Sequence, residues 1–221
     1  MAKNSKARGY SSLRRRKWAR MPYDRVLIVC EGSKTECNYF DEIRRKFRLP
    51  NTHIFVIPSE LGTNPRSVVN SAEQAFVTNL GSFERVFPVF DRDDHPDYAN
   101  AIFMATARNG RLRNDENKPV TFEPIVSVPC FEFWLLLHFE DIKHLLHKDV
   151  VLERLRGHIS DYTKGMLGVF GMTESLVSIA MQRADKLRET SDRTTGTDLY
   201  TDVHYLVGLL QNLTTSAHTP S

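Results

Sequence analysis

A short apolar run that ends in a cluster of acids is the feature that most constrains the fold of this chain. Residues 87–90 are followed at once by three carboxylates, those of Asp91, Asp93 and Asp94. A short apolar run bounded by turn residues predicts a buried strand of a parallel sheet. Ligands of open α/β sheets bind just beyond the carboxyl ends of such strands, which is where these acids would lie. The alternative is an acidic turn that caps the next helix, with Asp94 as the N-cap before Pro96.

Strand-like and helix-like segments alternate through the first two thirds of the sequence. Continuous apolar runs predict strands over residues 25–30, 53–58, 85–90 and 121–128. Apolar residues at helical spacing predict helices between these strands and over residues 130–139. The β-α-β-α-β-α-β-α order predicts an α/β fold with a mostly parallel four-stranded sheet flanked by helices, followed by a helical C-terminal part.

The chain divides into four expected segments. These are a basic, flexible N-terminal arm (1–23), an α/β domain (24–140), a helical extension packed on it (141–213) and a tail (214–221). No apolar run approaches the roughly 20 residues of a transmembrane helix, so we expect no contact with a membrane. The three cysteines show no CxxC spacing, which favours reduced thiols and a cytoplasmic location.

The N-terminal arm carries a strong positive charge that the net charge of +3 conceals. Residues 1–23 hold eight basic side chains and no acid, whereas the rest of the chain holds 22 basic and 27 acidic residues. A basic arm with Tyr10 and Trp18 available for stacking indicates binding to nucleic acid. The alternative is a disordered solubilising tail. The basic residues that we expect to contact phosphates are Arg14, Arg15, Arg16, Lys17 and Arg20.

Acidic residues follow three of the four predicted strands. Glu31 comes after the first, Asp91 and Asp93 after the third, and Glu132 just after the fourth. Parallel strands share one polarity, so these acids would meet at one edge and repel one another unless they share a cation. Carboxylates suit Mg²⁺ or Mn²⁺, and such a site suits phosphodiester chemistry. A second ion about 4 Å away would require Glu132 or Asp94.

Three motifs together resemble a known family. VLIVCEGSKTECNYF, followed about sixty residues later by FPVFDRDDH, is similar to the Toprim signature, in which one strand ends in Glu-Gly and another in DxD. With SVPCFEFWLLLHFE added, the set resembles the RloB-like family, small Toprim-fold proteins of bacterial defence and restriction-associated loci. The resemblance covers roughly residues 24–213. It implies a Toprim fold, dependence on a divalent metal and cleavage of nucleic acid.

The resemblance also implies roles for individual residues. It assigns Glu31 as a metal ligand or general base, and Asp91 and Asp93 as metal ligands. It makes Lys164 a candidate for stabilising the charge of the transition state. All four are therefore expected to be catalytic residues.

Four further residues are candidates for accessory roles at the same site. Glu132 is expected to be an additional ligand, and Asp94 could join it. Glu36 would support the site, although an acid is favoured in the first turn of a helix in any case. His138 is a candidate catalyst whose alternative is a structural histidine of the core.

Three functions remain open at this stage. The first is a metal-dependent nuclease of anti-phage defence, acting on RNA such as tRNA or on DNA. The second is a non-catalytic effector or binding module that works with a partner ATPase, since the chain has no phosphate-binding loop of its own. The third is a nucleotidyl transferase, which the absence of an evident template-binding or zinc domain disfavours.

Overall fold

The central sheet has six strands, two more than the sequence predicted. In the computed structural model, which describes residues 24–216, the strands are β1 (Val26–Cys30), β2 (Ile54–Pro58), β3 (Arg85–Asp91), β4 (Thr121–Phe122), β5 (Ile125–Val128) and β6 (Tyr200–Thr201). Their order is β2-β1-β3-β5-β6, and β4 pairs with β3. All pairings are parallel except that of β6 with β5. The prediction of a mostly parallel α/β sheet is confirmed, and the prediction of four strands is wrong.

Both additional strands have a local cause. The run predicted as one strand over 121–128 is interrupted at Glu123 and Pro124, because proline has no backbone N–H to donate to a sheet ladder. It therefore forms β4 and β5, both parallel to β3. Strand β6 is only two residues long and follows a threonine-rich loop, so no alternating pattern marks it in the sequence.

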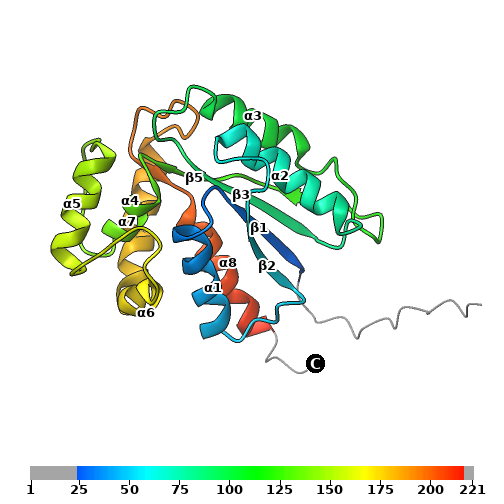
Figure 1. Ribbon diagram of the computed structural model, residues 1–221, viewed down its shortest axis with the longest axis horizontal. Helices are drawn as coiled ribbons and strands as arrows, with labels where there is room; N and C mark the ends of the chain where they lie inside the picture. The colour runs from blue at the N-terminus through cyan, green and yellow to red at the C-terminus, as the bar shows by residue number, and fades with distance from the viewer. Residues whose placement is uncertain (1–23, 217–221) are drawn as a thin grey trace, which may run out of the picture.

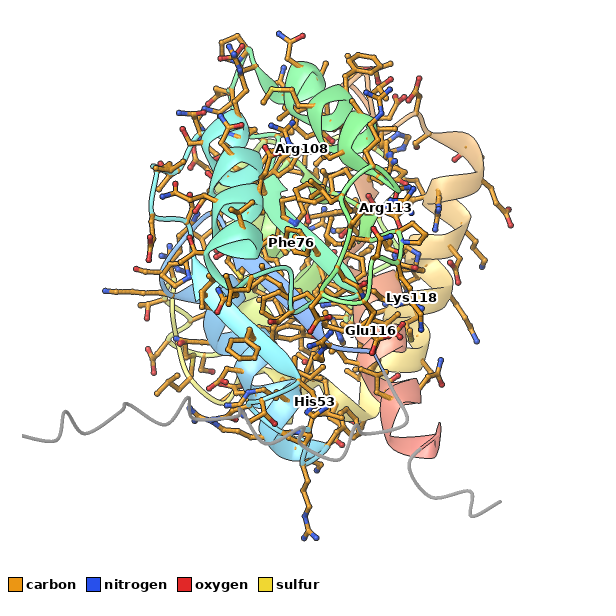
Figure 2. All side chains as sticks on the ribbon, turned by 90° about the vertical axis from the view of Figure 1, so that its right-hand side faces the viewer. His53, Phe76, Arg108, Arg113, Glu116 and Lys118 are labelled. Atoms are coloured by element: carbon orange, nitrogen blue, oxygen red, sulfur yellow. The ribbon has the colours of Figure 1, made fainter. Side chains whose placement is uncertain are left out.

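Helices cover both faces of the sheet (Figure 1). Helices α2 (Pro65–Thr78) and α3 (Tyr98–Arg108) pack on one face, and α1 (Thr35–Lys46) and α8 (Val203–Ser216) on the other. Strand β1 shows why both faces need cover. Its residues alternate between two buried apolar clusters, with Ile28 in the cluster of α1 and α8 and Leu27 in that of α2 and α3. Phe76 belongs to the latter cluster (Figure 2).

The helix starts are partly as predicted. Asn64 caps α2, its side chain accepting a hydrogen bond from the backbone N–H of Ser67 at 2.9 Å, with Pro65 at the first helical position. Helix α3 begins later than the capping alternative required, with Asp97 rather than Asp94 in the N-cap position. The acidic turn after β3 is therefore not the cap of a helix.

The C-terminal part is helical and shares the core of the sheet. After α4 (Phe131–Leu136), which closely follows β5, it contains α5 (Lys148–His158), α6 (Val169–Thr173), the short 3₁₀ helix η1 (Glu174–Leu176), α7 (Val177–Thr190) and α8. Apolar residues of α4, α5, α7 and α8 join the same buried cluster as α1. Helix α8 continues to Ser216, three residues into the segment expected to be a tail. Within the described residues no helix is long and apolar enough to cross a membrane.

Candidate metal centre

The carboxyl ends of β1 and β3 bring Glu31 and Asp91 together, sixty residues apart in sequence. The backbone N–H of Asp91 donates a hydrogen bond of 2.9 Å to Oε2 of Glu31. The carboxylate of Asp91 in turn accepts one of 3.0 Å from the backbone N–H of Phe131, at the start of α4. Adjacent parallel strands explain the first contact, because β1 and β3 pair directly and both end at this edge. The two acids are thus fixed to the backbone of their neighbours.

Three side chains at this edge offer a set of metal-ligating atoms. Glu31, Asp93 and His95 each contribute one such atom, and all three atoms lie within 4.8 Å of one another. Nε2 of His95 lies 3.7 Å from Oε1 of Glu31. The set differs from the one expected from the sequence, because His95 belongs to it and Asp91 does not. The histidine stands two residues after Asp93 in DRDDH, which is the signal that was available in the sequence.

The conformation of Asp93 turns its carboxylate into this set. Its backbone has a positive φ of 37°, which aspartate tolerates better than most residues, and its N–H donates to the carbonyl of Pro129 at 2.9 Å. Oδ1 of Asp93 is buried and has no hydrogen-bond donor among the described residues. The ammonium of Lys148 lies 3.6 Å from this oxygen, beyond hydrogen-bond distance. With Glu31 and His95 beside it, an oxygen that makes no hydrogen bond fits a hard divalent cation.

The acids of the site are crowded and poorly solvated. Burial, together with the charges of Glu36 and Asp93, raises the pKa of Glu31 to about 7, although the hydrogen bond from Asp91 opposes this. Burial, followed by the charges of Glu36, Glu31 and Glu132, raises the pKa of Asp91 well above its usual range. The ionised carboxylates are therefore costly to keep together in the folded protein.

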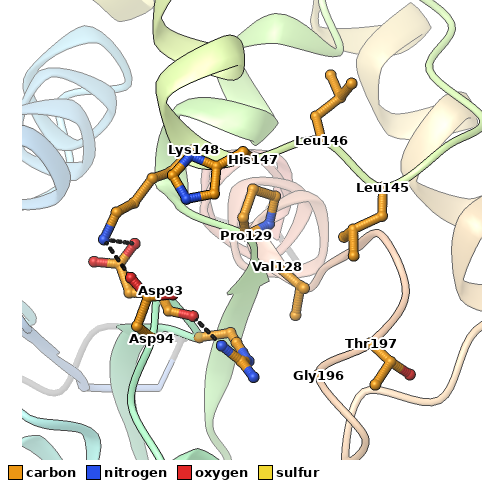
Figure 3. A pocket seen from close by; sticks show the side chains of 11 residues that line it. Asp93, Asp94, Val128, Pro129, Leu145, Leu146, His147, Lys148, Gly196 and Thr197 are labelled. Atoms are coloured by element: carbon orange, nitrogen blue, oxygen red, sulfur yellow. Dashed lines mark hydrogen bonds and ion pairs between the residues drawn. The ribbon is translucent and has the colours of Figure 1, made fainter.

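Two lysines from different segments face these acids. Nζ of Lys148, at the start of α5, lies 3.6 Å from Oδ1 of Asp93 and 3.1 Å from Oδ2 of Asp94 (Figure 3). Nζ of Lys164 lies 3.7 Å from Oε1 of Glu132. The two lysines line a cavity of about 130 Å³ together with Asp93 and Glu132. Lys148 was not among the residues expected from the sequence.

Helix α1 holds the loop that carries Lys164. The backbone N–H of Gly165 donates to Oγ1 of Thr35, and the side-chain amide of Asn38 donates to the carbonyl of Gly165, both at 2.9 Å. Gly165 has a φ of 84°, and a Cβ there would lie 2.7 Å from Cβ of Lys34. Only glycine allows this close approach, so the lysine is placed by a tight contact between distant segments.

The accessory candidates lie in different surroundings. Glu36 is buried in the first turn of α1, where burial and then the charge of Glu132 raise its pKa. Glu132 is buried in α4 and accepts a hydrogen bond of 3.4 Å from the hydroxyl of Tyr162. Asp94 is exposed and paired with Lys148.

His138 is not brought to the acids. Its Nδ1 lies 3.1 Å from the carbonyl oxygens of both Trp134 and Leu135, and its ring packs edge-on against Trp134. Burial lowers its pKa to about 4. These surroundings fit the alternative interpretation of His138 as a structural histidine of the core. The arm residues Arg14, Arg15, Arg16, Lys17 and Arg20 lie outside the described residues.

The comparison with protein families gives one match. A family model described as RloB-like protein matches residues 26–210, which span both the sheet and the helical C-terminal part. No curated protein and no solved structure matches the chain significantly. The matched segment includes the whole acidic edge and the loop of Lys164. The chain therefore belongs to the RloB-like family.

Proposed function

We propose that this protein is a divalent-metal-dependent nuclease of the Toprim type that cleaves phosphodiester bonds of nucleic acid in anti-phage defence. The observation that carries the proposal is the grouping of Glu31, Asp93 and His95, in which the buried Oδ1 of Asp93 makes no hydrogen bond and has the ammonium of Lys148 3.6 Å away. Such a set at the carboxyl edge of a parallel sheet suits a metal that also contacts a substrate phosphate. RNA such as tRNA, or DNA, is the proposed substrate class.

Each residue of the edge has a role in this proposal. Glu31, Asp93 and His95 would hold Mg²⁺ or Mn²⁺, and Asp91 positions Glu31 through its backbone N–H. When bound, the metal would neutralise charge on the phosphate and lower the pKa of an attacking water. Lys164 would stabilise the negative charge that develops on the phosphate, held in place by its loop on α1.

A lysine already inside the acidic set supports binding of a phosphate there. Lys148 contacts Asp93 and Asp94, so it partly balances their charge before any substrate arrives. A phosphate next to the metal would offer the ammonium group a second anionic partner.

The sequence has no phosphate-binding loop of its own, so any ATP hydrolysis coupled to cleavage would come from another chain. The proposal therefore keeps a partner ATPase.

The test is a cleavage assay with purified protein on tRNA, single-stranded RNA and plasmid DNA, in Mg²⁺, in Mn²⁺ and in chelator. We expect cleavage of at least one substrate with metal, and its loss in chelator and in Glu31→Gln and Asp93→Asn. Glu189→Gln, at an exposed position of α7, is the matched control and should cleave like wild type. Equal cleavage by wild type and both site variants would show that another group, or a contaminant, is responsible.

A further inference from the structure

A cavity of about 430 Å³ adjoins the acidic edge, and neither Glu132 nor Lys164 lines it. Figure 3 shows the side chains that line this cavity. Asp93 and Lys148 also line the smaller cavity, so the two cavities share a wall. The floor of the larger cavity is apolar and consists of Val128, Pro129 and Leu146, with Leu145 at its mouth. The side chain of Leu145 is 54% exposed, so its apolar surface is open to a ligand that enters the cavity.

The cations at the rim of this cavity already have partners. Arg92 donates a hydrogen bond from Nη1 to the backbone carbonyl of Asp93, and Lys148 is paired with Asp93 and Asp94. Arg92 is also fixed against Gly196, where an added Cβ would lie 2.9 Å from Cγ of the arginine. The planar guanidinium is therefore held as a wall of the cavity.

This combination of walls selects a particular kind of ligand. The ammonium of Lys148 already neighbours two carboxylates, and Val128, Pro129, Leu145 and Leu146 make much of the remaining lining apolar, so the cavity suits an uncharged flat group attached to a phosphate better than a free anion. Nucleobases stack on guanidinium planes, on histidine rings and on apolar side chains, and Arg92, His147 and Leu145 supply all three. The volume lies within the range of small-ligand sites.

We propose that this cavity binds one nucleoside of the nucleic-acid strand, the one next to the phosphodiester held at Glu31, Asp93 and His95. The inference rests on the proposed nuclease function, which it deepens by assigning a subsite for the base. Lys148 would then contact the phosphate between that nucleoside and the metal centre, because it lies on the wall that the two cavities share. A base unstacked from its neighbours in this way is typical of enzymes that act on single strands or loops.

The test measures binding of short fluorescent single strands of RNA and of DNA, in chelator so that no cleavage occurs. Leu145→Trp fills the mouth of the cavity, and Leu145→Glu places a charge there. Both changes are at an exposed position and leave Glu31, Asp93 and His95 untouched. Val77→Trp, at a 61% exposed position of α2, is the matched control. Melting curves establish that each variant is folded.

Both Leu145 variants are expected to weaken binding about five- to hundredfold, the range for loss of one stacked base, while Val77→Trp binds like wild type. In the cleavage assay Leu145→Trp should raise KM with little change in kcat. Folded Leu145 variants that bind as tightly as wild type, or a wild type that binds neither strand, would overturn the subsite.

The two proposals fail separately. Binding that depends on Leu145 without any cleavage in Mg²⁺ or Mn²⁺ refutes the nuclease and keeps the subsite. Cleavage that is lost in Glu31→Gln but has an unchanged KM in Leu145→Trp keeps the nuclease and refutes the subsite. A difference in affinity between the RNA and DNA strands would identify the sugar that the cavity accepts.

Discussion

Replacing Glu31 by glutamine is expected to stabilise the metal-free protein and to remove its response to metal. Burial, with the nearby charges of Glu36 and Asp93, raises the pKa of Glu31 from 4.5 to about 7. Because the folded-state pKa lies above the unfolded one, ionisation of this carboxyl opposes folding. The penalty is fully present above about pH 7 and disappears as the pH falls below about 4.5. At about 1.4 kcal/mol per pKa unit it amounts to about 3 kcal/mol at pH 8.

Glutamine keeps an oxygen that accepts the 2.9 Å hydrogen bond from the N–H of Asp91, but it carries no charge. The variant therefore lacks the destabilisation of about 3 kcal/mol that ionised Glu31 causes at pH 8. For a domain of this size, at about 2–4 °C per kcal/mol, this corresponds to a rise in Tm of about 6–12 °C in chelator. At pH 5.5 the destabilisation should shrink to about 1 kcal/mol, since Glu31 is then mostly protonated in the wild-type fold.

The assay is thermal unfolding followed by circular dichroism, in chelator and in excess Mg²⁺ or Mn²⁺. The wild type should gain about 2.7 kcal/mol when the free metal is a hundred times its Kd, and Glu31→Gln should gain nothing comparable. Glu189→Gln controls for the loss of an exposed acid. A Glu31→Gln variant that melts below the wild type in chelator at pH 8 would refute the reasoning, because burial of the charge would then not be costly.

Three further predictions concern other parts of the fold. Trp134→Phe removes the indole N–H that donates to the hydroxyl of Tyr39 at 2.9 Å, and should cost about 2–4 kcal/mol in urea unfolding. Gly165→Ala forces a contact with Lys34 at a φ of 84°, so kcat for cleavage should fall more than the melting temperature suggests if the loop places Lys164. His138 is buried with its pKa lowered to about 4, so the folded protein loses stability as the pH falls from about 6.5 toward 4. His138→Gln should flatten that pH profile in melting experiments, and an unchanged slope would contradict the assignment.

The parts of the fold that the sequence predicts are those set by local pattern. The parallel sheet follows from continuous apolar runs that alternate with helical spacing, and Asn64 followed by Pro65 marks the start of α2. Strand β6 escapes prediction because two residues carry no periodicity and pair only through contact with β5. The break between β4 and β5 was visible in principle, since Pro124 cannot donate to a ladder.

The residues of the site also fall into two groups, those that the strand pattern predicts and those that tertiary contacts bring to the site. Glu31 and Asp91 meet because adjacent parallel strands end together, which strand polarity alone predicts. His95 and Lys148 are brought in by the conformation of the turn after β3 and by the start of α5, and neither has a periodic signal. His138 lies in an apolar sequence, and its burial among the residues of α4 is what such a context favours.

The energetics of the acidic edge make it a poor structural element. Burial and the charges of neighbouring carboxylates raise the pKa values of Glu31, Glu36 and Asp91, in a region where apolar residues would pack without this penalty. Lys148 and Lys164 offset this only partly, since their Nζ atoms stay 3.6 and 3.7 Å from Oδ1 of Asp93 and Oε1 of Glu132. A charge arrangement that opposes folding is expected where function requires it, and in the proposed metal centre a divalent cation would supply the compensation that the side chains lack. The stability of the metal-free protein is therefore as direct a measure of this site as its activity, and the gain on Glu31→Gln tests it without any assumption about the substrate.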